Sequence, residues 1–408
     1  MTLFGTLRTP RNLVFGAGQR GALPAYARSL GRRALIVTDE RLAADVTFAA
    51  LIDGIGNAGV ATRVFSGTIA ELPASCIAEG VEAGRAFDPD VIIGIGGGSC
   101  IDASKVIALL LAHGGTAGDY YGEFKVPGPV LPLIAVPTTS GTGSEVTPVA
   151  VIADPDRVLK VGIASPHLIP HTAICDPELT YTCPPSLTAI SGADALTHAI
   201  EAFTTVRRDP TATIVHEHVF LGKNALSDHH ALLAISQIAA SLKAAYDNGA
   251  DAVARERLML GATAAGLAFG TAGTAAAHAV QYPVGALTHT PHGAGVAVML
   301  PYVMEFNRPH VIPAMAEIAD AMGVETTGLS DDQKASAAID AVAGLFASIG
   351  IPRTIAELGV REDQLSLVAE QAMGVTRLIK NNPRPLDPES MATLVTAAFH
   401  GDRSRLRD

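Results

Sequence analysis

The sequence of 408 residues contains no tryptophan, and aromatic side chains make up 5% of it and charged ones 17%. So few aromatic residues argue against a binding surface built on aromatic anchors. Basic residues are outnumbered, 29 against 40 acidic ones, which gives a formal net charge of −11. Because nucleic acids and anionic membranes are bound by clusters of Lys and Arg, this composition argues against both as partners.

Cysteine is also scarce. The four cysteines are widely spaced and form no Cys-x-x-Cys pair, which favours a reduced, cytoplasmic protein over a disulfide-stabilised one. The N-terminus has neither the basic region nor the apolar region of a signal peptide. The one basic cluster, at 403–407, is interpreted as a short solvated tail.

A long, unbroken hydrophobic run is missing as well. Between Leu258 and Phe306 the only charged residue is Glu305, but prolines, glycines and three histidines interrupt the stretch. A membrane-spanning helix needs about 20 strongly apolar residues. We therefore predict a buried helix followed by an irregular active-site loop.

Hydrophobic residues make up 48% of the chain, which is enough to fill the cores of two domains. In the first half, short apolar runs of the kind found in buried parallel strands alternate with helical patterns. The runs are Arg33–Thr38, Asp90–Gly94 and Val130–Val136, and the helical patterns include Ala74–Ala86 and Ile101–His113. This alternation predicts a mostly parallel sheet.

The second half differs, because no period-two strand pattern follows Ser186 and long Ala/Leu-rich stretches dominate. These stretches are Ala231–Tyr246, Ala252–Phe269 and Ser336–Ile349. We predict an α/β, Rossmann-like domain at 1–184 and an all-α domain at 185–408.

A glycine-rich segment, Gly94–Lys105, lies between a predicted strand and a predicted helix. Glycines let the backbone approach a pyrophosphate, and the N-terminus of a helix offers free N–H groups to it. Ser99 is expected to cap this helix, and it stands where a GxGxxG fingerprint has its last glycine. The alternative interpretation is an ordinary tight turn.

Two further features favour a dinucleotide. Asp39 ends the first strong strand, where a carboxylate accepts hydrogen bonds from ribose hydroxyls and disfavours the 2′-phosphate of NADP; a simple helix cap is the alternative. The segment Pro137–Glu145 concentrates Thr and Ser hydroxyls and two glycines after the third strand. Such a loop suits a bound polar ligand.

Asp194 and His198 have i,i+4 spacing, which places both on one helical face. Taken alone, the pair is better explained as an acid near the N-terminus of a helix and an ordinary buried histidine. Two more histidines lie in the uncharged stretch: His278, expected at the end of a buried helix, and His292, expected on the loop behind it. Buried imidazoles need partners, and a metal is one such partner. Three imidazoles and a carboxylate suit Fe(II), Zn, Co or Ni, and ligand chemistry alone favours Zn over Fe(II).

The chain resembles the iron-containing (group III) alcohol dehydrogenase family from about Phe15 to Arg384. Four features carry the resemblance, in this order: GGGS-x-x-D-x-x-K, PTTSGTGSE, DPELT and the Asp/His pattern. The resemblance implies a metal-dependent, NAD-linked alcohol dehydrogenase or aldehyde reductase that holds Fe(II), with Zn as an alternative. The implied metal ligands are Asp194, His198, His278 and His292. The implied dinucleotide-binding residues are Asp39, Gly96, Gly97, Gly98, Ser99, Asp102, Thr138, Thr139, Thr142, Ser144, Lys160 and Leu179.

Two features depart from the common family pattern. Tyr282 stands where many members have a histidine, and we predict that it, or a water chain, relays a proton. His289 is predicted to contact substrate or solvent without binding the metal. Tyr282 and the insertion Thr211–Lys223 are similar to the hydroxyacid–oxoacid transhydrogenase branch, which retains its NAD. That branch has a longer loop between its last two histidines, which is missing here.

The poverty of basic residues bears on the substrate, since Leu258–Met304 contains no Lys or Arg. Hydroxy acids carry a carboxylate and call for basic side chains in the site. A more remote alternative, a dehydroquinate-synthase-like lyase, would bind phosphorylated, carboxylated substrates and call for them too. We therefore expect a small, mostly uncharged alcohol or aldehyde. The family resemblance implies a homodimer or a higher homo-oligomer.

Overall fold

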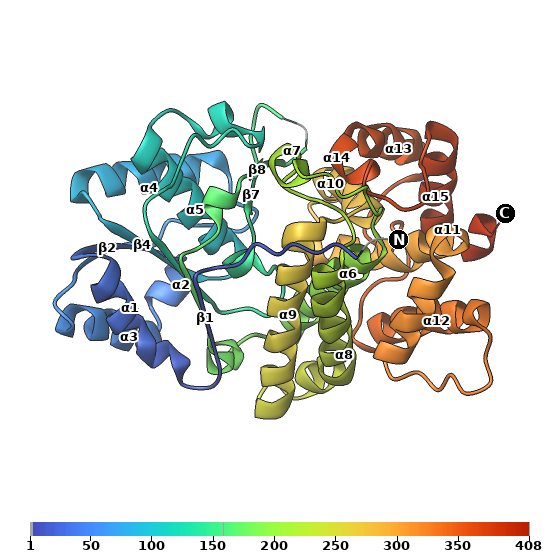
Figure 1. Ribbon diagram of the computed structural model, residues 1–408, viewed down its shortest axis with the longest axis horizontal. Coiled ribbons are helices and arrows are strands. Elements are labelled where there is room, and N and C mark those ends of the chain that lie inside the picture. The colour runs from blue at the N-terminus through green and yellow to red at the C-terminus, as the bar shows by residue number, and fades with distance from the viewer. Residues whose placement is uncertain (1–2, 158, 408) are drawn as a thin grey trace. The chain divides into compact units, whose positions relative to one another are not determined.

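The computed structural model describes residues 3–157 and 159–407, which form two compact units (Figure 1). The N-terminal unit comprises residues 8–182 together with His216–Val219, and the helical unit comprises 3–7, Cys183–Val215 and 220–407. Within the N-terminal unit, the Val219 N–H donates to the Glu123 carboxylate at 2.8 Å. Part of the 211–223 insertion is thus built into the N-terminal unit.

A six-stranded sheet organises the N-terminal unit, with strand order β1-β9-β6-β4-β2-β3. All neighbouring strands in it pair in parallel. The strands are β1 (Asn12–Phe15), β2 (Arg33–Val37), β3 (Ala61–Phe65), β4 (Val91–Gly96), β6 (Leu133–Pro137) and β9 (Thr172–Cys175). A smaller sheet contains β5 (Gly122–Glu123), β7 (Val149–Ile152) and β8 (Val161–Ala164).

Helices cover both faces of the larger sheet, as the alternation along β2 shows. Ala34 and Ile36 belong to a core with residues of α1 (Leu23–Leu30) and α3 (Val46–Asn57). Leu35 and Val37 belong to a second core, with residues of α4 (Ala74–Phe87) and α5 (Gly98–His113). Burial on both faces explains why the central strands are continuous apolar runs.

The three predicted strands are confirmed as β2, β4 and β6, whereas β1, β3, β5 and β7 to β9 were not predicted. β1 and β7 to β9 have four residues each and β5 has two, and β3 at the sheet edge has no buried residue. Edge strands need not be apolar, since only one side of their backbone is paired. Exposure thus accounts for the missing signal at β3, whereas β9 (TAIC) is buried but only four residues long.

The strand order reverses at β2, because β3 lies on one side of it and β4 on the other. In parallel α/β sheets, ligands bind outside the carboxyl ends of the strands at such a reversal. Asp39 follows β2 and Gly97 follows β4. The topology thus places both predicted dinucleotide-binding positions at this point.

Helices form the rest of the chain, and no strand follows β9 in the described residues. The α/β fold followed by an all-α region is therefore confirmed. The helices are α6 (Pro185–Thr204), α7 (Ile214–Glu217), α8 (Ala225–Asp247), α9 (Ala252–Ala272), α10 (Ala276–Thr288), α11 (His292–Ala321), α12 (Asp331–Ser348), α13 (Leu365–Gly374), α14 (Thr376–Ile379) and α15 (Pro388–His400). In this unit α6, α8 and α9 pack against one another.

The predicted irregular loop after α9 is wrong, because α10 and α11 occupy most of that stretch. Pro283 lies inside α10 and Pro301 inside α11. Each proline removes one helical hydrogen bond, but both helices are largely buried and tertiary packing holds them. Across the described residues, no single helix is long and apolar enough to cross a membrane. Helices α9 and α10 have the required length and hydropathy only when taken together, and the pair is bent by 102°.

The C-terminal tail is docked onto the helical unit, while its Arg405 and Arg407 side chains stay exposed to solvent as expected. Arg407 pairs with the buried Glu305 at 3.2 Å, and Arg403 pairs with Asp340 at 2.7 Å. Leu406 between them is buried. Glu305 and Asp340 lie on α11 and α12, so sequence near the tail gives no sign of these partners.

Candidate functional site

Helix α6 carries the first part of a polar cluster inside the helical unit. Asp194, His198 and Glu201 recur at i, i+4 and i+7, so they share one face of the helix. All three are buried among apolar neighbours. A buried polar face of this kind requires partners from other elements.

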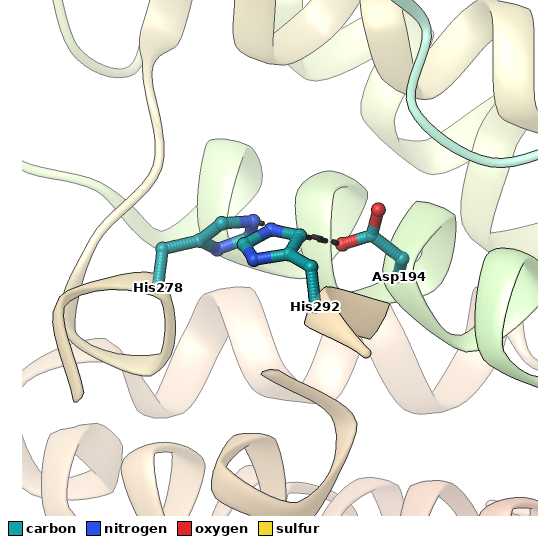
Figure 2. Close-up of side chains that lie close together, drawn as sticks. All are labelled: Asp194, His278 and His292. Carbon is teal, nitrogen blue, oxygen red and sulfur yellow. Dashed lines mark ion pairs between the residues drawn. The ribbon is translucent and has the colours of Figure 1, made fainter. Parts of the chain in front are cut away.

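Two histidines from neighbouring helices complete the cluster. His278 lies in the first turn of its own helix, α10, instead of at the end of α9, and His292 begins α11 instead of sitting on a loop. Figure 2 shows both imidazoles directed toward the Asp194 carboxylate. Potential ligand atoms of Asp194, His278 and His292 all lie within 4.8 Å of one another.

The distances centre on one oxygen. Asp194 Oδ1 lies 3.7 Å from His198 Nε2, 3.7 Å from His278 Nε2 and 3.9 Å from His292 Nε2. Metal–ligand bonds of about 2.0–2.2 Å separate neighbouring ligand atoms by about 3.0–3.6 Å, so Asp194, His278 and His292 lie close to the spacing of ligands on one ion. His198 contacts the shared oxygen of Asp194 from outside this group of three. His278 Nε2 is buried and accepts no hydrogen bond from the described residues. The donor set therefore fits a divalent metal.

Glu201 is a member of this site that sequence reasoning missed. Its Oε2 lies 2.6 Å from His278 Nδ1 and accepts from the Ala275 N–H at 2.9 Å, while Oε1 accepts from the Ala277 N–H at 2.7 Å. The signal was present, because Glu201 continues the periodicity of Asp194 and His198 by one turn.

Close packing holds α6 against α9, α10 and α11 around the cluster. The His198 ring stacks on Phe269 of α9, with centroids 4.1 Å apart, and on His278 at 4.7 Å. Gly293 follows His292, and a Cβ there would lie 2.3 Å from the Ile190 carbonyl oxygen and 3.3 Å from Asp194 Cβ. Only glycine lets α11 begin this close to α6.

The structure places the two predicted catalytic residues differently. The Tyr282 ring, on α10 and half-buried, is 6.3 Å from the His292 ring between centroids. His289 is exposed at the C-terminal cap of α10, with a left-handed φ of 55°. Tyr282 therefore borders the metal cluster, whereas His289 stands at a helix end that faces solvent.

The predicted glycine turn links β4 to α5 in the N-terminal unit. A Cβ at Gly96, whose φ is 151°, would lie 2.5 Å from Cys100 Sγ, and one at Gly98 would lie 2.6 Å from Thr142 Cγ2. A Cβ at Gly97 would be 3.6 Å from Thr139. The turn and the hydroxyl-rich loop are thus brought together.

Ser99 does not cap α5, contrary to expectation. Gly97 is the N-cap, no side chain caps the helix, and Ser99 lies within the first turn. Glycine is accepted at this position, and an uncapped N-terminus leaves backbone N–H groups for an anion. The difference strengthens the interpretation as a phosphate-binding turn.

Asp39 serves as a helix cap in this structure, because its Oδ1 accepts the Leu42 N–H at 2.8 Å. Its Oδ2 lies 3.9 Å from Cys100 Sγ. Burial and the nearby Asp39 carboxylate raise the pKa of the Cys100 thiol to about 12. The thiol is therefore protonated at neutral pH, and Asp39 lies beside the glycine turn.

Asp102 belongs to a buried network behind the turn. It accepts the Ser144 hydroxyl at 2.5 Å and the Val151 N–H at 2.9 Å, and Lys105 Nζ lies 3.8 Å away. Burial raises the pKa of Asp102. Lys105 donates to the Thr147 and Val149 carbonyls, and burial lowers its pKa to about 8. The network fixes α5 to the segment after the hydroxyl-rich loop.

The remaining predicted dinucleotide-binding residues lie near this framework. The N–H of Thr138, which is buried, donates to the Gly96 carbonyl at 3.0 Å. Lys160, half-buried, pairs with Glu71. Leu179 packs against the core under α1 and α3. Thr138 is thus linked directly to the glycine turn, whereas Lys160 and Leu179 contact other groups.

Family models match both parts of the chain. Residues 10–177 match the model described as iron-containing alcohol dehydrogenase, and residues 188–399 match the C-terminal model of the Fe-containing alcohol dehydrogenase family. The chain is 34% identical over 382 residues to long-chain-alcohol dehydrogenase 1 of Geobacillus thermodenitrificans, covering 93% of this chain and 92% of that one.

Solved structures agree with these matches. A crystal structure of 1,3-propanediol oxidoreductase superposes with a TM-score of 0.90 at 32% identity, over 97% of this chain and all of that one (100%). Sulfoacetaldehyde reductase from Bifidobacterium kashiwanohense in complex with NAD+ superposes with a TM-score of 0.83 at 26% identity, over 98% and 99%.

Proposed function

Since this chain belongs to the iron-containing alcohol dehydrogenase family, an oxidoreductase family of NAD-linked alcohol and aldehyde interconversion, we propose that Asp194, His198, His278 and His292 hold its iron. One observation carries this assignment: Nε2 atoms of three histidines lie 3.7–3.9 Å from a single buried carboxylate oxygen. Three imidazoles and one carboxylate also accommodate Zn, so metal analysis of the purified protein distinguishes the two.

When bound, the metal supplies Lewis acidity toward an alcohol or carbonyl oxygen, and NAD supplies the hydride acceptor or donor. The chain's own residues bind and orient NAD and the substrate. The uncapped first turn of α5 and Gly96–Gly98 receive the pyrophosphate, and Asp39 accepts the ribose hydroxyls. The proposed lining is completed by Ser99, Asp102, Thr138, Thr139, Thr142, Ser144, Lys160 and Leu179.

A small, mostly uncharged alcohol or aldehyde is the proposed substrate. Phe269 stacks on His198, and the stretch Leu258–Met304, which provides Phe269, His278 and His292, contains no Lys or Arg. An anionic substrate would lack a cationic partner from these helices. The relatives named above act on a long-chain alcohol, 1,3-propanediol and sulfoacetaldehyde, so local side chains set the specificity within the family.

Tyr282 is the proposed proton relay, because its ring borders His292 and its phenol both accepts and donates. His289 is proposed to contact substrate or solvent from the C-terminal end of α10. Four free cysteines support a reducing, cytoplasmic location. We further propose a homodimer or higher homo-oligomer, which sedimentation measures directly.

The function is tested by anaerobic reconstitution with Fe(II), followed by NADH absorbance over a panel of alcohols, aldehydes and hydroxy acids. Turnover of free NAD with uncharged alcohols is the expected result. If the enzyme instead oxidises a hydroxy acid only when 2-oxoglutarate is added, and exchanges no free NAD, it is a transhydrogenase. Absence of bound metal after reconstitution would overturn the ligand assignment.

A further inference from the structure

Glu201 lies beside the four proposed metal ligands and contacts both the His278 ring and the backbone at the start of α10. It is buried in the middle of the helical unit, with 2% of its surface exposed. A carboxylate taken out of water is costly unless hydrogen bonds satisfy its oxygens. Both oxygens are satisfied here, by the His278 ring and by the N–H groups of Ala275 and Ala277.

The contact with His278 determines which ring nitrogen is available. Because Glu201 Oε2 lies 2.6 Å from Nδ1, the carboxylate accepts a hydrogen bond from Nδ1–H. A neutral imidazole has one N–H, so Nε2 then carries a lone pair. That atom lies 3.7 Å from Asp194 Oδ1, on the side where the ligand atoms converge.

The two backbone contacts hold the helix that carries this histidine. Ala275 is the N-cap of α10 and Ala277 lies in its first turn, and no N-cap side chain of its own satisfies their N–H groups. Glu201 supplies the missing acceptor from α6, and its negative charge suits the positive end of the helix dipole. One side chain thus fixes both the start of α10 and the ring of His278.

We infer that Glu201 is a positioning residue that orients His278 and holds it in the metal-binding tautomer. This inference rests on the proposed metal-holding role of the cluster and extends it to a residue outside the four ligands. Partners that accept the second N–H of a ligating histidine raise metal affinity by about 10- to 100-fold. Glu201 therefore contributes to metal affinity without contacting the ion.

The test compares Glu201→Ala and Glu201→Gln with a variant that loses a helix cap elsewhere. Asp251→Ala is that control, because Asp251 caps α9 through the Ala254 N–H at 3.0 Å. Zn(II) and anaerobic Fe(II) affinities are measured by competition with a chelator, and thermal stability is measured without metal. We expect Glu201→Ala to weaken metal binding about 10- to 100-fold and Asp251→Ala to leave it unchanged, although both lose a cap.

A second measurement needs no metal. Histidine ¹⁵N spectra of the metal-free protein report which His278 nitrogen carries the proton. The expected wild-type signal is that of Nδ1–H, shifting toward Nε2–H in Glu201→Ala. Should Glu201→Ala be unfolded, Glu201→Gln takes its place, because an amide keeps the shape of the side chain but presents only one acceptor oxygen.

The outcomes separate the two proposals. Unchanged metal affinity in folded Glu201 variants, or an Nε2–H signal in wild-type protein, overturns the role of Glu201. If wild-type protein binds neither metal but shows the Nδ1–H signal that Glu201→Ala loses, the metal-holding proposal fails and the orienting contact stands.

Discussion

The glycine turn of the N-terminal unit and the metal cluster of the helical unit are built in opposite ways. The turn uses consecutive residues after β4, and the groups proposed to bind its ligand are backbone N–H groups at an uncapped helix start. The cluster uses side chains from α6, α10 and α11, which lie far apart in sequence. Binding at the turn should therefore be weakened by adding a Cβ to a glycine, whereas binding at the cluster should be weakened by removing a side chain.

The largest expected effect is loss of the central ligand. Asp194→Ala removes the oxygen on which the three Nε2 atoms converge, and we expect loss of bound metal and a fall in kcat/KM of roughly a thousandfold or more. NADH binding, measured by fluorescence, should stay within about twofold, because the turn lies in the other unit. Loss of NADH binding together with metal would show that the two sites are not independent.

Removal of one hydroxyl tests the border of the cluster. Tyr282→Phe keeps the ring beside His292 but cannot exchange a proton, and we expect kcat to fall by about a hundredfold with an altered pH–rate profile. Metal content should not change. Tyr246→Phe on α8 is the matched control and should behave as wild type. An unchanged pH–rate profile in Tyr282→Phe would exclude the relay.

An added methyl group tests the turn. Gly98→Ala places a Cβ 2.6 Å from Thr142 Cγ2, and relief of such a clash costs about 1–3 kcal/mol. We expect about tenfold weaker NAD binding with full metal content. Gly56→Ala on α3 is the control, because nothing lies within 4 Å of its Cβ. If both variants bind NAD equally, close approach at Gly98 is unimportant.

The smallest effect concerns the buried Lys105 behind the turn. Burial lowers its pKa from 10.5 to about 8, so between these values the unfolded chain binds more protons at this group than the folded one. Its contribution to stability therefore increases as pH rises from about 8 toward 10.5. Denaturant unfolding should show that wild type gains stability over Lys105→Met across this range. A constant difference would contradict the shifted pKa.

The two sites also differ in how far sequence predicted them. The glycine turn, Asp39 and the hydroxyl-rich loop each follow a recognisable apolar strand, so their meeting at one edge of the sheet follows from strand order. Ser99 was misassigned as a cap because cap preference favours Ser over Gly, whereas α5 begins two residues earlier, after Gly97. The contact of Ser144 with Asp102 depends on how the loop folds back, which local pattern does not encode.

The metal cluster was predicted as a set of residues but not as a geometry. The i,i+4 pair is local, and uncharged surroundings marked His278 and His292. The helices that carry them were assigned wrongly, because prolines suggested a loop where burial sustains α10 and α11. Glu201 continues the periodicity of Asp194 and His198, but its partners, the N–H groups of Ala275 and Ala277, belong to another helix and are invisible in the local sequence.

By itself, the sequence determined the fold class and the glycine turn, and it supplied the four side chains proposed to bind the metal, since these depend on periodicity and residue chemistry over short distances. Only the tertiary structure decided that three imidazoles meet at one oxygen of Asp194 and that Glu201 turns His278 toward it. The reason is physical: helices far apart in sequence meet through packing and through the need to satisfy buried polar groups.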